Sequence, residues 1–241
     1  MDDTEFELLE TILYDPPSGF FLLNQHLERL IKSALYFSEN SKSKVFKNCT
    51  SSEFGSVVEK ELQQSVEKLG KEVRLTVNKD GIIKVASTVL PNSSSSVTPE
   101  PLKIVLDKKY TSSDNIFLRH KTTNRKAYDD AKIRAGLPLL PGPNKTKDNE
   151  IFDVLMYNEN NEITECTISN IAVESRDQRW ETPQIECGLL PGVMRAYLMN
   201  IDEITPSVIT IEDLKIAQQE GRRIKCFNSV RKEFEVVLVE Q

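Results

Sequence analysis

Three segments of this sequence carry residue types that could act together in chemistry. Lys121 lies in the stretch 119–125, Arg-His-Lys-Thr-Thr-Asn-Arg, between a strand-like run and a helix-like run. Glu165 follows a polar turn further along the chain. Residues 188–195, Gly-Leu-Leu-Pro-Gly-Val-Met-Arg, then form a turn that leads into another helix-like run. The chain therefore presents a lysine, a carboxylate and a turn suited to anions, in that order.

Each segment suits one part of a single kind of chemistry. A lysine amine attacks an aldehyde when burial or neighbouring cations keep part of it uncharged, and Arg119, His120 and Arg125 supply such charge. A carboxylate such as that of Glu165 can keep a pyridine nitrogen protonated. The free N–H groups at a helix start bind phosphate. Together these are the parts that a pyridoxal phosphate enzyme needs, although each also has an ordinary structural interpretation.

Two further segments could add to a phosphate site. Arg29 follows His26 by one helical turn, and an arginine there could contact phosphate through two parallel hydrogen bonds. The alternative is that this pair forms the polar edge of an amphipathic helix. Ser229, in Asn-Ser-Val-Arg after an apolar run, could supply a hydroxyl donor, or the segment could be a simple strand-end turn.

The bulk composition is that of a soluble globular protein. The 241 residues are 39% hydrophobic and 28% charged, and the net charge of −6 argues against a general nucleic-acid binder. No apolar run is long enough for a membrane span, and the acidic N-terminus lacks the apolar core of a signal peptide. The four cysteines lie far apart, without the spacing of a metal site. We therefore expect a cytoplasmic protein with reduced thiols and no bound metal.

The pattern along the chain indicates two α+β domains. A serine- and proline-rich stretch at 91–101 reads as a linker between a smaller N-terminal domain, 1–90, and a larger C-terminal domain, 102–241, that carries Lys121. The expected strands are 6–14, 20–23, 73–77, 82–89, 102–106, 152–157, 168–173, 224–227 and 234–239. The expected helices are one capped by Asn24, then 51–69, 124–135, 192–199 and 211–219.

Six stretches, in order, resemble the class IV aminotransferase family, the fold-type IV pyridoxal phosphate enzymes. They are residues 21–30, 120–128, 162–171, 182–183, 188–195 and 227–231. The stretches His-Lys-Thr-Thr-Asn-Arg and Asn-Ser-Val-Arg resemble the 4-amino-4-deoxychorismate lyase branch in particular. The resemblance implies a two-domain fold like that of D-amino acid aminotransferase, with the cofactor in the interdomain cleft.

The resemblance also implies a role for each matching residue. Lys121 would bind pyridoxal 5'-phosphate covalently, Glu165 would face the ring nitrogen, and Thr11 would act beside the lysine as in lyases of the family. The phosphate would be held by Arg29, by the backbone amides of Val193 and Met194, and by Ser229. The partners would be a small-molecule amine and a second copy of the chain in a homodimer.

The implied reaction converts 4-amino-4-deoxychorismate to 4-aminobenzoate, a folate precursor, and pyruvate. Two alternatives stay open: a transaminase of branched-chain or D-amino acids that uses the same cofactor, and a relic of the fold without catalysis. The chain departs from the family pattern at two places. Lys232 and Glu233 replace an expected Gly-aromatic pair, and the glycine-rich segment that usually precedes the first strand is missing. These departures concern the substrate more than the cofactor.

Overall fold

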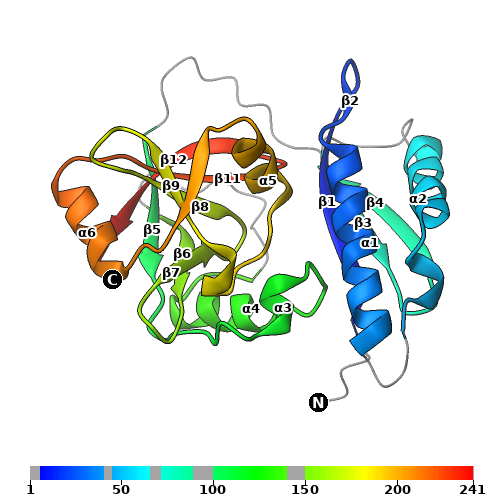
Figure 1. Ribbon diagram of the computed structural model, residues 1–241, viewed down its shortest axis with the longest axis horizontal. Coiled ribbons are helices and arrows are strands. Elements are labelled where there is room, and N and C mark those ends of the chain that lie inside the picture. Colours follow the sequence, from blue (N-terminus) through cyan, green and yellow to red (C-terminus); the bar gives the residue numbers. More distant parts are fainter. Residues whose placement is uncertain (1–5, 41–44, 66–71, 89–99, 140–149, 241) are drawn as a thin grey trace. The chain divides into compact units, whose positions relative to one another are not determined.

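The computed structural model describes residues 6–40, 45–65, 72–88, 100–139 and 150–240 (Figure 1). These residues fall into two compact units. The first contains the described residues up to 88 together with His120–Asn124, and the second contains residues 100–119 and 125–240. Lys121 therefore belongs by its contacts to the first unit, whereas the sequence predicted it in the C-terminal domain. Residues 91–99 of the predicted linker lie outside the described residues.

The first unit is a four-stranded antiparallel sheet with two helices. Its strands are β1 (Leu8–Asp15), β2 (Gly19–Phe20), β3 (Glu72–Val77) and β4 (Ile83–Thr88), in the order β2-β1-β3-β4. Helix α1 (Leu23–Asn40) packs against β1 and α2 (Ser52–Ser65) against β4, and the two helices contact each other. Both helices therefore cover the same face of the sheet (Figure 1), and a short 3-10 helix, η1 (Lys47–Cys49), joins them.

The helix-covered face is mostly apolar and contains one buried carboxylate. Register pairs Leu8 with Val77 and Ile12 with Val73, and all four side chains are fully buried. Leu30, Ala34 and Phe37 of α1 complete this core, as their helical spacing predicts. Glu10 lies between Leu8 and Ile12 in the same row and is 1% exposed. The row thus contains a buried carboxylate among apolar neighbours.

The second unit is built on an eight-stranded mixed sheet in the order β10-β9-β8-β11-β12-β5-β6-β7. Its strands are β5 (Leu102–Leu106), β6 (Ile151–Tyr157), β7 (Ile163–Cys166), β8 (Asn170–Glu174), β9 (Trp180–Pro183), β10 (Ile204–Ser207), β11 (Ile224–Asn228) and β12 (Lys232–Val239). Its helices are α3 (Ile116–Arg119), α4 (Lys126–Arg134), η3 (Ile185–Cys187), α5 (Val193–Asn200) and α6 (Ile211–Gln219).

Both faces of the larger sheet are covered. Neighbouring residues on a strand point to opposite faces, and Ile104 and Val105 of β5 accordingly enter two different apolar clusters. The cluster around Val105 includes Ala131 of α4, and the cluster around Ile104 includes Leu214 of α6. The sheet is therefore the central layer between α4 on one face and α6 on the other.

The longer periodic elements agree with the sequence, and several short ones were missed. The strand predicted at 20–23 is wrong beyond Phe20, because β2 is only Gly19–Phe20 and α1 already includes Leu23. Asn24, expected to cap α1, lies inside the helix, which begins at Leu23. Strands β7, β9 and β10 are four residues each and had not been predicted as strands. All four cysteines are free and buried, which confirms the prediction of reduced thiols.

Candidate active site

The sheet of the first unit holds the candidate lysine. Leu9 N–H donates to the Lys121 carbonyl at 3.0 Å, and Leu8 forms an antiparallel bridge with Thr122. The segment that carries Lys121 thus pairs with the start of β1, whereas β2 pairs with the opposite end of that strand. A local sequence pattern gives no sign of this pairing, because the two partners are more than a hundred residues apart in the chain.

Thr11 and Lys121 share one face of this sheet. Thr122 lies opposite Leu8, so the alternation of a strand places Lys121 opposite Leu9, and Leu9 shares its face with Thr11. Glu10 points to the other face, toward α1, where it meets His26 and Arg29. The first unit therefore presents Thr11 with Lys121 on one side of β1 and Glu10 with Arg29 on the other.

Glu10, His26 and Arg29 form a buried polar cluster. Arg29 Nε donates to Glu10 Oε1 at 2.9 Å and Arg29 Nη2 to Oε2 at 2.5 Å, while His26 Nδ1 lies 2.6 Å from Oε2. Burial alone would raise the pKa of Glu10, but Arg29 and then His26 outweigh it and lower this pKa to about 2. Glu10 is therefore ionised throughout the physiological range.

The ionised carboxylate fixes the tautomer of His26. Burial lowers the pKa of His26 despite the opposing influence of Glu10, so the ring is neutral at pH 7. Since Glu10 can only accept, Nδ1 carries the proton and Nε2 is an acceptor. Nε2 is buried and has no hydrogen-bond partner among the residues that the structure describes. Sequence reasoning had not identified Glu10; the signal was a charged residue in the buried register of an alternating strand.

In the second unit, Glu165 is a carboxylate held by three donors. It is the next-to-last residue of β7, before Cys166, and its side chain is 3% exposed. Oε1 accepts from the Tyr128 hydroxyl at 2.8 Å and from the Leu190 amide at 2.9 Å, and Oε2 accepts more weakly from Asn170 Nδ2 at 3.3 Å. Glu165 is therefore buried and held in one orientation.

The turn before α5 requires its glycines. Gly188 has φ +90°, and a Cβ there would lie 2.5 Å from Ser113 Cα. A Cβ on Gly192 would lie 1.9 Å from Asn170 Oδ1. No side chain caps α5, which begins at Val193, so the first-turn amides that include those of Val193 and Met194 have no acceptor within the helix. An uncapped helix start of this kind attracts anions.

Two further polar groups belong to the second unit. Ser229 is 8% exposed and follows β11 in a turn where Asn228 Oδ1 accepts from the amides of Val230 and Arg231. Arg195, in the first turn of α5, is 6% exposed and donates through Nη2 to the Pro183 carbonyl at 2.9 Å. Burial lowers the pKa of Arg195 against the attraction of nearby carboxylates, and its Nε has no partner among the described residues.

These residues fit a phosphorylated aldehyde cofactor with a pyridine ring. The first unit offers an amine, on Lys121, and a guanidinium, on Arg29, two of whose donors are directed to Glu10. The second unit offers an oriented carboxylate, on Glu165, and an uncapped helix start behind Gly192. The chemistry of this donor set matches an aldehyde, a phosphate and a ring nitrogen.

The described residues hold no group of three or more histidine, cysteine, aspartate or glutamate side chains arranged for a metal ion. Within the same part of the chain, every helix is too short or too polar to cross a bilayer. Neither finding adds a ligand to the candidate site.

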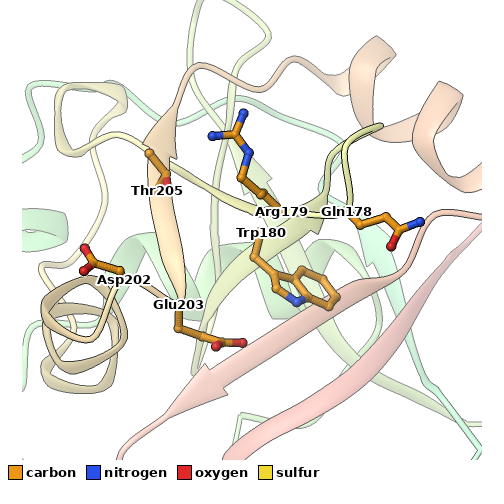
Figure 2. Close-up of a pocket in the computed structure, with 6 residues that line it drawn as sticks. All are labelled: Gln178, Arg179, Trp180, Asp202, Glu203 and Thr205. Carbon is orange, nitrogen blue, oxygen red and sulfur yellow. The ribbon is translucent and has the colours of Figure 1, made fainter.

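A separate pocket of about 300 Å³ lies at the edge of the larger sheet (Figure 2). It is lined by Gln178, Arg179, Trp180, Asp202, Glu203 and Thr205. Beside it, Lys225 Nζ lies 3.2 Å from Glu203 Oε1 and 4.3 Å from the centre of the Trp180 ring. None of the predicted site residues lines this pocket.

Comparison with known proteins gives the family. A family model described as amino-transferase class IV matches residues 7–238. The chain belongs to the class IV aminotransferase family and has the mixed two-sheet fold of the fold-type IV enzymes.

Three relatives show how far the similarity extends. A Schizosaccharomyces pombe protein named "Putative aminodeoxychorismate lyase" is 30% identical over 242 residues, which cover 98% of this chain and 91% of that protein. The Saccharomyces cerevisiae aminodeoxychorismate lyase is 25% identical over 251 residues, covering 88% of this chain and 65% of the yeast protein. A solved structure from Mesorhizobium loti, named "Putative amino-acid aminotransferase", has a TM-score of 0.76 at 25% identity and covers 98% of this chain and 100% of its own.

Proposed function

We propose that this protein is a pyridoxal-phosphate-dependent lyase that converts 4-amino-4-deoxychorismate to 4-aminobenzoate and pyruvate. The observation that carries the proposal is the similarity, over nearly the whole chain, to a protein named for that activity. The placement of Thr11 on the same face of β1 as Lys121 supports it, because a hydroxyl beside the lysine can serve proton transfer.

Each residue would contribute a separate function. Lys121 would bind the cofactor through its amine, and Arg29, Ser229 and the amides of Val193 and Met194 would hold the phosphate. Glu165 would keep the ring nitrogen protonated. The cofactor, when bound, supplies an electron sink for the bond that breaks.

Two proton movements would fall to side chains of this protein. The amine of Lys121 would accept the proton from the substrate carbon that bears the amino group. The hydroxyl of Thr11 would donate a proton to the departing pyruvate fragment. The products need no oxidant, because loss of pyruvate leaves an aromatic ring.

A transaminase acting on amino acids is the second candidate, and the similarity to the Mesorhizobium loti structure favours it. The two reactions give different products from different substrates. Purified protein supplied with pyridoxal phosphate should release pyruvate and 4-aminobenzoate from 4-amino-4-deoxychorismate. Formation of a new amino acid from a keto acid, without pyruvate release, would instead establish the transaminase.

The assignment of Lys121 has its own test. Borohydride reduction should fix the cofactor to a peptide that contains Lys121, and Lys121→Ala should lose both this adduct and activity. Lys126→Ala is the matched control, since Lys126 is 60% exposed and pairs with Asp130. An adduct that persists in Lys121→Ala would remove this lysine from the site. The homodimer remains a prediction, which light scattering of the purified protein would test.

A further inference from the structure

Tyr128 directs a hydroxyl from an apolar core toward the candidate carboxylate. It lies in the first turn of α4 and is 6% exposed, among the apolar side chains of Val105, Leu118 and Met156. Its hydroxyl donates to Glu165 Oε1 at 2.8 Å. A phenylalanine would fill the same apolar space, so packing alone does not account for the hydroxyl.

A cation is placed over the same ring. The guanidinium carbon of Arg125 lies 4.6 Å from the centre of the Tyr128 ring, and Arg125 Nη2 donates to the Thr167 carbonyl at 2.7 Å. A cation above a phenol ring withdraws electron density from it and makes its hydroxyl a stronger donor. Arg125, Tyr128 and Glu165 therefore form a short polar chain inside the second unit.

We propose that Tyr128 is a positioning residue that keeps Glu165 ionised and fixed, so that the proton it shares with the cofactor ring nitrogen stays on the nitrogen. This inference rests on the proposed function, because it takes Glu165 as the partner of that nitrogen. The physical reason is that a donor to a buried carboxylate stabilises its charged form relative to its neutral form. Without the hydroxyl, only the Leu190 amide and the weaker Asn170 donor oppose burial, so the balance moves toward the protonated carboxyl, which cannot hold the nitrogen protonated.

The first experiment uses the protein without cofactor. The carboxyl of Glu165 is followed with pH by ¹³C NMR of glutamate-labelled protein, and Glu165→Gln identifies its signal. In Tyr128→Phe the carboxyl should take up its proton at a pH about one unit higher than in the wild type, a tenfold change in its acid constant.

Thr164→Val is the matched control. Thr164 precedes Glu165 on β7, so its hydroxyl points to the other face of the strand; it is buried and has no hydrogen-bond partner among the described residues. Removing it deletes a buried hydroxyl from the same strand without deleting a donor to the carboxylate, so the titration of Glu165 should not move. Equal titrations of wild type and Tyr128→Phe would overturn the inference, as would an equal shift in Thr164→Val.

The second experiment uses protein loaded with pyridoxal phosphate labelled with ¹⁵N in its ring. In the wild type and in Thr164→Val, the ring nitrogen should show the chemical shift of a protonated pyridine at neutral pH. In Tyr128→Phe it should move toward the value of an unprotonated ring. An unchanged ring nitrogen in Tyr128→Phe would contradict the inference even if turnover were slower, because a merely structural role would slow turnover without moving the proton.

A third variant should shift the protonation of Glu165 in the opposite direction, which a misfolded protein would not do. Incorporation of 3-fluorotyrosine at position 128 makes the hydroxyl a stronger donor with little change of shape, so Glu165 should take up its proton at a lower pH. A shift in the other direction would overturn the inference. Failure of the wild-type protein to take up cofactor would refute the proposed function, and it would be seen before any variant was compared.

Discussion

Glu10→Gln should remove an acid-sensitive part of the free energy of unfolding. The pKa of Glu10 is lowered from 4.5 to about 2 in the folded chain, a difference of about 2.5 units, and each unit corresponds to about 1.4 kcal/mol. Glu10 therefore contributes roughly 3 kcal/mol, which is fully present above pH 4.5 and is lost as the pH falls toward 2. About 1.4 kcal/mol of it should be gone by pH 3.5.

The assay is urea denaturation at pH 5.5, 4.5 and 3.5, followed by circular dichroism. The wild type should lose about 1.4 kcal/mol more than Glu10→Gln across this range, because the glutamine has no proton to take up. At pH 5.5 the variant should already be less stable by about 3 kcal/mol, since Arg29, 12% exposed, loses its buried charge partner. Burial lowers the pKa of His26 although Glu10 opposes it, so stability also falls below pH 6.5, where the unfolded chain takes up the proton first.

Glu28→Gln is the matched control for this experiment. It makes the same change of charge on an exposed residue of α1, next in sequence to Arg29. Its unfolding free energy should follow the wild type at every pH. If Glu10→Gln also runs parallel to the wild type between pH 5.5 and 3.5, the ionised and buried state assigned to Glu10 is wrong.

Three further outcomes can be checked. Gly188→Ala should lower the free energy of unfolding by more than the roughly 1 kcal/mol that positive φ alone costs, because its Cβ would overlap Ser113. Gly136→Ala is the control: Gly136 has φ +71° and a Cβ there would meet nothing within 4 Å, so the same urea experiment should show the conformational cost alone. Arg29→Lys should weaken pyridoxal phosphate binding by about tenfold or more but leave binding of pyridoxal, which lacks the phosphate, unchanged in fluorescence titrations. Thr11→Val should lower kcat for pyruvate release with little change in the cofactor dissociation constant; a normal kcat would remove Thr11 from catalysis.

The sequence predicted those elements whose pattern is local. The spacing of Leu30 and Ala34 indicates α1, and the turn at 78–81 indicates the β3–β4 hairpin, because periodicity and turn chemistry are properties of neighbouring residues. Strands β7, β9 and β10 are too short and too polar for alternation to be visible. They become strands by pairing within the larger sheet, and only the folded chain supplies those partners.

Some residues of the candidate site could likewise be predicted from a local pattern, and others could not. Residues 188–195 could be singled out because glycine and proline mark turns wherever they occur. The position of Lys121 could not, since it depends on pairing with β1 at a sequence distance that no local pattern records. Glu10 and Tyr128 were missed because a strand glutamate and a helix tyrosine are ordinary by type, and only their contacts with Arg29 and Glu165 distinguish them.

The return of residues 121–123 to β1 has a consequence for synthesis of the chain. Until those residues have left the ribosome, the start of β1 lacks its neighbour on that side, and the backbone groups of Glu7 and Leu9 have no strand to pair with there. An open edge of this kind invites pairing with another chain. A gene cut before residue 120 therefore encodes a first unit without this pairing. A split protein should recover the pairing at the start of β1 only when a second fragment supplies the lysine segment.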